Sequence, residues 1–212
     1  MGSDGITRST FILRGALGVA ATYGIGAVTP YVSEALASAA DDQEVLAFAL
    51  GLEQLESAFY KAASSRAGLS GQAATLAKSF GSHEDDHVKA LSQLITQLGG
   101  KPAAAPKAKF GLTDQASFLK LAVRLEDLGV AAYNGAGKLL INPDYLLVAG
   151  KIVSVEGRHA AAIRDLLAPA SFAGNDVVDG NGLDQAKAPA DVLAAADPFI
   201  PTTGTASNLP TS

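Results

Sequence analysis

Two histidines in this chain each follow a glutamate at the same short spacing. Glu84 precedes His87 by three residues, and Glu156 precedes His159 by three residues. Side chains three positions apart lie on one face of an α-helix, so each pair can direct a carboxylate and an imidazole to one point. A further glutamate stands about thirty residues before each pair. The complete set is Glu53, Glu84, His87, Glu126, Glu156 and His159.

The surrounding apolar residues place these six side chains on core-facing positions. Around Glu84 and His87, for example, a seam from Ala73 to Leu98 advances by steps of three and four residues, as in a bundle helix. Unpaired buried carboxylates are costly, and neighbouring carboxylates repel one another. Two divalent cations would balance four glutamates. Carboxylate and imidazole ligands suit both iron and manganese. The sequence therefore predicts a site for two iron (or manganese) ions.

The two sets belong to an internal duplication. The segments around Glu53 and Glu126 share Leu-Glu-x-Leu, and each has a tyrosine seven residues after the glutamate, Tyr60 and Tyr133. We take both tyrosines as candidate catalytic residues, because a hydroxyl beside the metals could donate to a ligand or carry an electron. The alternative is that both are core aromatic residues whose hydroxyls are hydrogen-bonded.

One acidic residue breaks the duplication. Glu56 lies on the same helical face as Glu53, but its counterpart in the second half is Gly129. The duplication favours Glu53 as the ligand. It leaves Glu56 as an extra ligand, as an acid hydrogen-bonded behind the ligands, or as a group satisfied in another way.

A rival motif overlaps the first pair. His83, Glu84 and His87 match H-E-x-x-H, in which two histidines hold zinc and the glutamate activates water in a metalloprotease. The second half has Val155 where the first histidine would stand, and no metzincin-like third ligand follows. The zinc protease is therefore the minor alternative, with His83 as a boundary residue of its helix.

Four helical segments must position these residues, so the predicted fold class is all-α. We expect helices over about residues 41–67, 70–98, 113–140 and 143–168, with Ser70, Thr113 and Asn142 as N-caps. Two short connections and one long one, residues 99–112, are typical of a ferritin-like four-helix bundle with one crossover. Residues 169–212 are expected to form an irregular tail on the bundle, with a short helix near 190–196 and apolar docking near 198–201.

Residues 1–40 have the pattern of an export signal. Arg8 and Arg14 precede an apolar run, and small residues follow it, with cleavage expected at 35–37 or 37–39. Ser9 stands where the twin-arginine motif has its second arginine, which leaves ordinary secretion open. The alternative is an uncleaved N-terminal anchor, the one part expected to associate with a membrane. We expect the protein in the periplasm, in the cell envelope or outside the cell.

Composition excludes several other functions. The net charge is −5 and no basic stripe is present, so we expect no nucleic acid partner. There is no cysteine, which excludes disulfides, thiolate metal sites and a cysteine nucleophile. Whether the chain forms a homo-oligomer is left open.

The motifs resemble those of the ferritin-like di-iron carboxylate superfamily, and most closely its exported, desiccation-related type. The resemblance rests on FALGLEQLESAFY at 48–60, EDDHVKAL at 84–91 and PFI at 198–200. It implies that the six residues bind metal and that oxygen or peroxide is the reaction partner. It leaves two functions open: an oxidoreductase of ferroxidase, peroxidase or catalase type, or a non-catalytic envelope or stress protein whose metal site is structural or vestigial.

Overall fold

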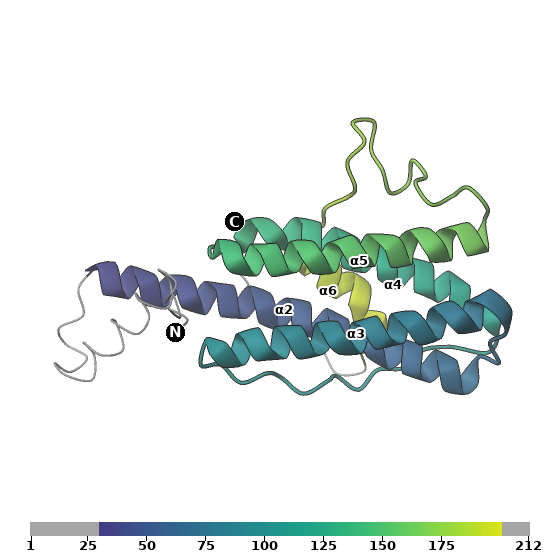
Figure 1. Cartoon of the computed structure of the whole chain (residues 1–212), viewed down its shortest axis with the longest axis horizontal. Coiled ribbons are helices and arrows are strands. Elements are labelled where there is room, and N and C mark those ends of the chain that lie inside the picture. The colour runs from purple at the N-terminus through teal and green to yellow at the C-terminus, as the bar shows by residue number, and fades with distance from the viewer. Residues whose placement is uncertain (1–29, 201–212) are drawn as a thin grey trace, which may run out of the picture.

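Four long helices form the body of the molecule. The computed structural model describes residues 30–200, and this part of the chain contains no β-strand. The long helices are α2 (Pro30–Arg66), α3 (Gly71–Gln97), α4 (Gln115–Ala136) and α5 (Pro143–Leu167). Helix α2 packs on α3 and α4, and α5 packs on the same two helices, which closes a four-helix bundle (Figure 1). The predicted all-α, ferritin-like bundle is confirmed.

The connections pair the helices as two hairpins. Residues 67–70 join α2 to α3, and the short 3₁₀ helix η2 (Gly137–Leu139) leads from α4 towards α5. The crossover, residues 98–114, runs back along the length of the bundle, so α3 and α4 point in the same direction (Figure 1). The Gln54 amide holds the crossover by donating to the Ala103 carbonyl at 2.9 Å.

Some helices begin at other residues, or have other capping residues, than predicted. Asp114, rather than the predicted Thr113, caps α4, and it forms a capping box with Ser117. Asn142 caps α5 as predicted. Ser70 precedes α3, but its side chain makes no capping bond; its backbone N–H and its hydroxyl both donate to Oε1 of Gln115. Helix α2 begins at Pro30, eleven residues before the predicted start.

The core consists of two apolar clusters with a polar layer between them. One cluster surrounds Phe59, Tyr60 and Phe118, and the other surrounds Leu50 and Leu91. On α3, the residues of the first cluster end at Phe80, and those of the second begin at Leu91. Glu84 and His87 lie in the interval, so the predicted ligands are enclosed by apolar side chains from both ends.

The tail folds back onto the bundle. Its helix α6 (Pro189–Ala196) forms close to the predicted position, and η3 (Asp197–Phe199) follows. Val192 and Ala196 are buried, while Phe199 and Ile200 pack partly buried against the first cluster. The Lys187 N–H donates to the Ala131 carbonyl at 2.9 Å, which ties the tail directly to α4, the helix of Glu126.

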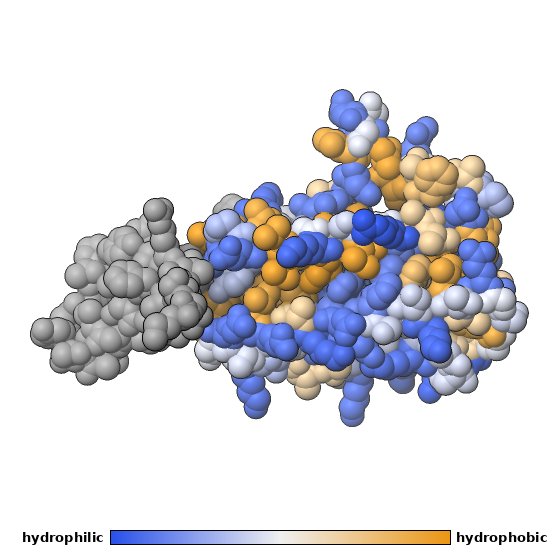
Figure 2. Space-filling model, viewed as in Figure 1, coloured by the Kyte–Doolittle hydropathy of each residue, from blue (hydrophilic) through white to orange (hydrophobic). Residues whose placement is uncertain are grey.

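The outer surface is mixed in character. Helix α5 carries three exposed leucines, Leu146, Leu147 and Leu167, and Figure 2 shows apolar surface over this helix beside hydrophilic surface over α3. Between residues 30 and 200, no helix combines the length and the apolarity needed to cross a bilayer. The arginines and most of the apolar run of the predicted export signal, which is also the alternative anchor, fall in residues 1–29, outside the described part.

Candidate metal centre

Each long helix contributes a glutamate from its middle to one buried point. Helices α2 and α4 supply one glutamate each, and α3 and α5 each supply a glutamate and the histidine one turn later. All four glutamates are fully buried, and both histidines belong to the core. The structure thus brings together all six predicted residues: Glu53, Glu84, His87, Glu126, Glu156 and His159.

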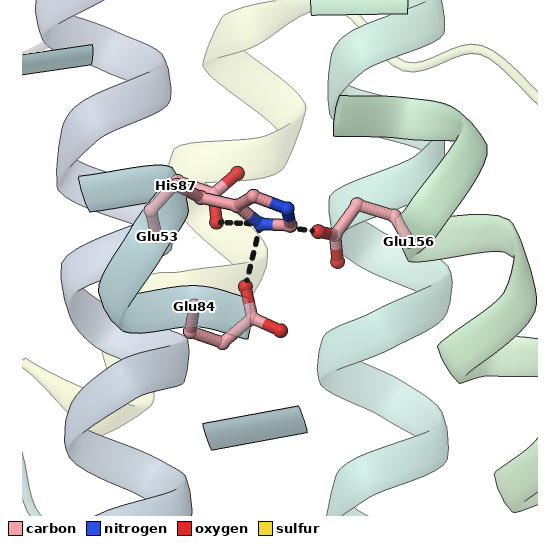
Figure 3. Close-up of side chains that lie close together, drawn as sticks. All are labelled: Glu53, Glu84, His87 and Glu156. Atoms are coloured by element: carbon pink, nitrogen blue, oxygen red, sulfur yellow. Dashed lines mark hydrogen bonds and ion pairs between the residues drawn. The ribbon is translucent and has the colours of Figure 1, made fainter. Parts of the chain in front are cut away.

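His87 is the centre of a first cluster. Its Nδ1 lies 3.1 Å from Oε2 of Glu53, 3.1 Å from Oε2 of Glu84 and 3.0 Å from Oε1 of Glu156. Figure 3 shows the three carboxylates converging on this one nitrogen from three helices. The same nitrogen that approaches three carboxyl groups could instead coordinate a cation beside them.

A second cluster also consists of three glutamates and one histidine, with Glu126 and His159 in place of Glu53 and His87. The Nδ1 of His159 lies 3.0 Å from Oε1 of Glu84, 3.4 Å from Oε2 of Glu126 and 3.8 Å from Oε2 of Glu156. In each cluster one potential ligand atom per residue lies within 4.8 Å of all the others. Glu84 and Glu156 belong to both clusters, so the two sites share two carboxylates.

The tyrosines connect the two halves. The Tyr60 hydroxyl donates to Oε1 of Glu126, and the Tyr133 hydroxyl donates to Oε1 of Glu53 at 2.5 Å. Each tyrosine therefore binds the glutamate of the opposite half. Tyr60 and Tyr133 are thus core aromatic residues whose hydroxyls are hydrogen-bonded to carboxylates of the clusters, and a catalytic role for them stays a prediction.

Protons can balance the charge among these six side chains. Burial raises the pKa of Glu156 to about 8, and it also raises the pKa of Glu53 and of Glu126. Burial opposes ionisation of Glu84 too, but its contacts with the two imidazoles outweigh this effect and hold its pKa at about 2. Burial likewise opposes protonation of the imidazoles. The carboxylates overcome it and raise the pKa of His87 to about 12 and that of His159 to about 10.

These residues fit a metal pair. Some buried atoms of the centre lie within ion-pair distance of a neighbour but make no hydrogen bond within the described part of the chain: Glu84 Oε1, Glu126 Oε2, both oxygens of Glu156 and His159 Nδ1. Buried polar atoms without partners are rare and costly. Oxygen and imidazole nitrogen donors suit a divalent transition metal, so cations would satisfy the atoms that protons leave unpaired.

Glu56 stays outside both clusters. It is buried, and burial followed by the charge of Glu156 raises its pKa well above the ordinary value. A Cβ atom on Gly129 would lie 2.9 Å from its Oε1. The glycine that replaces a second glutamate in the duplication therefore makes room for this carboxyl group, a contact that the sequence gives no means of foreseeing.

His83 does not join His87 at either cluster. It lies on the exposed side of α3, and its Nδ1 is 2.9 Å from Nε2 of His159 on α5. The two histidines of the H-E-x-x-H motif thus contact different partners. This geometry is unlike that of a zinc protease, in which both imidazoles would bind one ion.

Comparison with known families agrees with this geometry. A family model for the ferritin-like domain matches residues 41–169, while no curated protein matches the chain. The finer resemblance to exported, desiccation-related proteins stays a prediction. The matched segment covers more than half of the chain, from α2 to the end of α5, and includes both Glu and Glu-x-x-His sets. The chain therefore belongs to the ferritin-like domain family.

Proposed function

We propose that this protein holds two ferrous ions between its four helices and uses them to reduce dioxygen or peroxide. The observation that carries the proposal is the pair of overlapping buried clusters, which share Glu84 and Glu156 and contain unpaired ligand atoms. Glu53 and His87 would hold one ion, Glu126 and His159 would hold the other, and the two shared glutamates would bridge them. Both imidazoles present Nδ1 to the centre.

The protein contributes position, charge and exclusion of water. When bound, the metal pair would supply the electrons for reducing dioxygen or peroxide. Tyr60 and Tyr133 keep the two outer glutamates in place through their hydroxyl groups. The two apolar clusters limit the access of water, which strengthens electrostatic interactions within the site.

An apolar pocket leads to one of these tyrosines. Leu46, Leu52, Leu91 and Ala149 help to line it, and Tyr133 forms part of its wall. Its free volume is about 20 Å³, enough for one water-sized molecule. Such a small apolar space would admit dioxygen more readily than a hydrated ion or a bulky organic substrate, and it lies against Tyr133, whose hydroxyl contacts Glu53.

Anaerobic loading with ferrous ion, followed by desalting and metal analysis, tests the ligand set. We expect about two ions per chain, and fewer than about one in the double variant Glu53→Ala, His159→Ala, which loses one ligand from each site. Asp86→Ala is the matched control, because this exposed residue pairs with Lys89 on the same helix. If the wild type binds fewer than about one ion per chain and the double substitution does not change this number, the proposal is contradicted. Anomalous scattering at the iron and manganese edges would identify the metal.

Stopped-flow oxidation of ferrous ion separates catalysis from simple binding. We expect oxidation to be faster with the protein than without it, and slow again in the double variant. If two ions bind but oxidation is not accelerated, the metal pair is structural, as in the non-catalytic alternative.

We further propose that the protein is exported, on the pattern of residues 1–40 alone. Mass spectrometry of the mature N-terminus tests this proposal. A chain that begins near residues 38–40 would support it, and one that begins at Met1 would contradict cleavage.

A further inference from the structure

The two ring nitrogens of His159 face different neighbours. Nδ1 faces Glu84 and Glu126 inside the bundle. Nε2 faces outward and lies 2.9 Å from Nδ1 of His83. The rings of His83 and His159 are nearly parallel, at 7° with centroids 5.1 Å apart, and Phe80 stacks on His159 at 3.9 Å. His83 itself is exposed.

The inward contacts determine where the His159 proton must be when a cation is bound. A metal-ligating nitrogen needs its lone pair, so the proton of the neutral ring lies on the other nitrogen. With the cation at Nδ1, Nε2 carries the hydrogen and donates it to Nδ1 of His83. His83 then accepts with Nδ1 and keeps its own hydrogen on Nε2.

The other half of the duplication lacks this arrangement. His87 also directs Nδ1 at carboxylates, but no protein group in residues 30–200 hydrogen-bonds to its Nε2. The position equivalent to His83 is Val155, which has no hydrogen-bonding side chain. The two metal sites therefore have matching inner ligands but different outer support.

We propose that His83 is a positioning residue: it accepts a hydrogen bond from His159 Nε2, holds the Nδ1 lone pair towards the centre, and so raises the affinity of the His159 metal site alone. This inference rests on the proposed function, because it concerns a metal held by the same six residues. Outer hydrogen-bond partners of ligating histidines typically contribute 10–100-fold to metal affinity.

Three substitutions at His83 separate hydrogen bonding from packing. His83→Phe keeps an aromatic ring beside Phe80 and His159 but removes the acceptor and shields the site from water. His83→Ala removes the ring and admits a water, which can accept the bond in its place. His83→Gln restores an acceptor on a flexible side chain.

The experiment is an anaerobic titration of the full-length protein with Co²⁺, in which the visible absorption of the bound ion measures binding. In wild type we expect two ions. In His83→Phe we expect the dissociation constant of one ion to rise about 10–100-fold while the other is unchanged. His83→Ala should show a smaller rise, and His83→Gln should lie closest to wild type. Val155→Ala, at the equivalent position of the other half, should change neither constant.

The outcomes distinguish the two proposals. If the wild-type protein binds no Co²⁺, both the metal centre and the role of His83 are wrong. If the wild type binds two ions and His83→Phe binds them equally well, the metal centre stands and the role of His83 is wrong. A greater loss in His83→Ala than in His83→Phe would show that the ring acts only by packing, and would also overturn the proposal.

Discussion

Tyr60 and Tyr133 show how a single side chain can join the halves of a duplicated fold. Each stands seven residues after the glutamate of its own half, yet donates its hydroxyl hydrogen to the glutamate of the other half. Burial and the neighbouring glutamate raise the pKa of both hydroxyls, so both remain donors at neutral pH. The outer glutamates thus depend on residues more than sixty positions away in the chain.

Removing one of these hydroxyls should weaken both the fold and the metal site. We expect Tyr60→Phe to lower the free energy of unfolding by about 1–3 kcal/mol, because the Glu126 oxygen loses its buried donor. The His159 metal site should also bind more weakly. Tyr133→Phe should have the same effect through Glu53, on the His87 site.

Chemical denaturation of the metal-free protein and Co²⁺ titration would measure the two effects. Tyr145→Phe is the control, because this tyrosine is more exposed and its surroundings include none of the six cluster residues. Equal stability and equal affinity in the Tyr60 and Tyr145 variants would show that the hydroxyl contact contributes nothing.

At the scale of elements, the close packing of the tail on α4 depends on a glycine in that helix. Gly135 lies in α4, and a Cβ atom there would stand 1.8 Å from the Lys187 carbonyl oxygen of the tail. A backbone hydrogen bond joins Lys187 of the tail to Ala131 of α4, close to this glycine. The close approach therefore needs glycine, although the helix itself would be more stable with alanine.

We expect Gly135→Ala to push the tail away from α4 and to lower the free energy of unfolding by about 1–3 kcal/mol. Trypsin cleavage after Lys187 should become severalfold faster, because cleavage follows the population of the opened tail. Gly150→Ala is the matched control, since a Cβ atom on this α5 glycine meets nothing within 4 Å. Equal cleavage rates in the two variants would mean that the tail tolerates the added methyl group.

The sequence predicts the elements and the residues of the two buried clusters better than it predicts contacts between elements. Glu84 and His87 could be found because helical spacing alone places them on one face. Thr113 is the predicted cap of α4 but Asp114 takes that position, because both residue types can cap a helix and the backbone path selects between neighbours. The contact of His83 cannot be predicted in this way, because its partner, His159, lies on another helix, at a distance that no periodicity encodes.

At the scale of the whole molecule, the centre links stability to pH. The raised pKa values mean that the metal-free native state holds protons that the unfolded chain releases. Their stabilising effect is full below the ordinary pKa values, 4.5 for Glu156 and 6.5 for the histidines. It is lost as pH rises through the native values, about 8 for Glu156 and about 10 for His159. Glu84, whose pKa is lowered to about 2, acts in the opposite sense, but only in more acidic solution.

We therefore expect the melting temperature of the metal-free protein to fall as pH rises from about 5 to about 9. Metal should reverse this trend, because cations replace the protons and bind more tightly as pH increases. Thermal unfolding with a chelator and with Co²⁺, at a series of pH values, measures both curves. A metal-free protein whose stability rises over this interval would contradict the charge state described for the centre.

The two carboxylates shared by the clusters have a further consequence. Neither hairpin can complete a site alone, because the His87 cluster needs Glu156 and the His159 cluster needs Glu84. A polypeptide with a single hairpin could assemble these ligands only as a symmetric dimer, in which every substitution would appear on both sides. Joining the two copies in one chain removes that constraint, so that His83 can face His159 while its counterpart is Val155, and Glu56 can occupy the space left by Gly129.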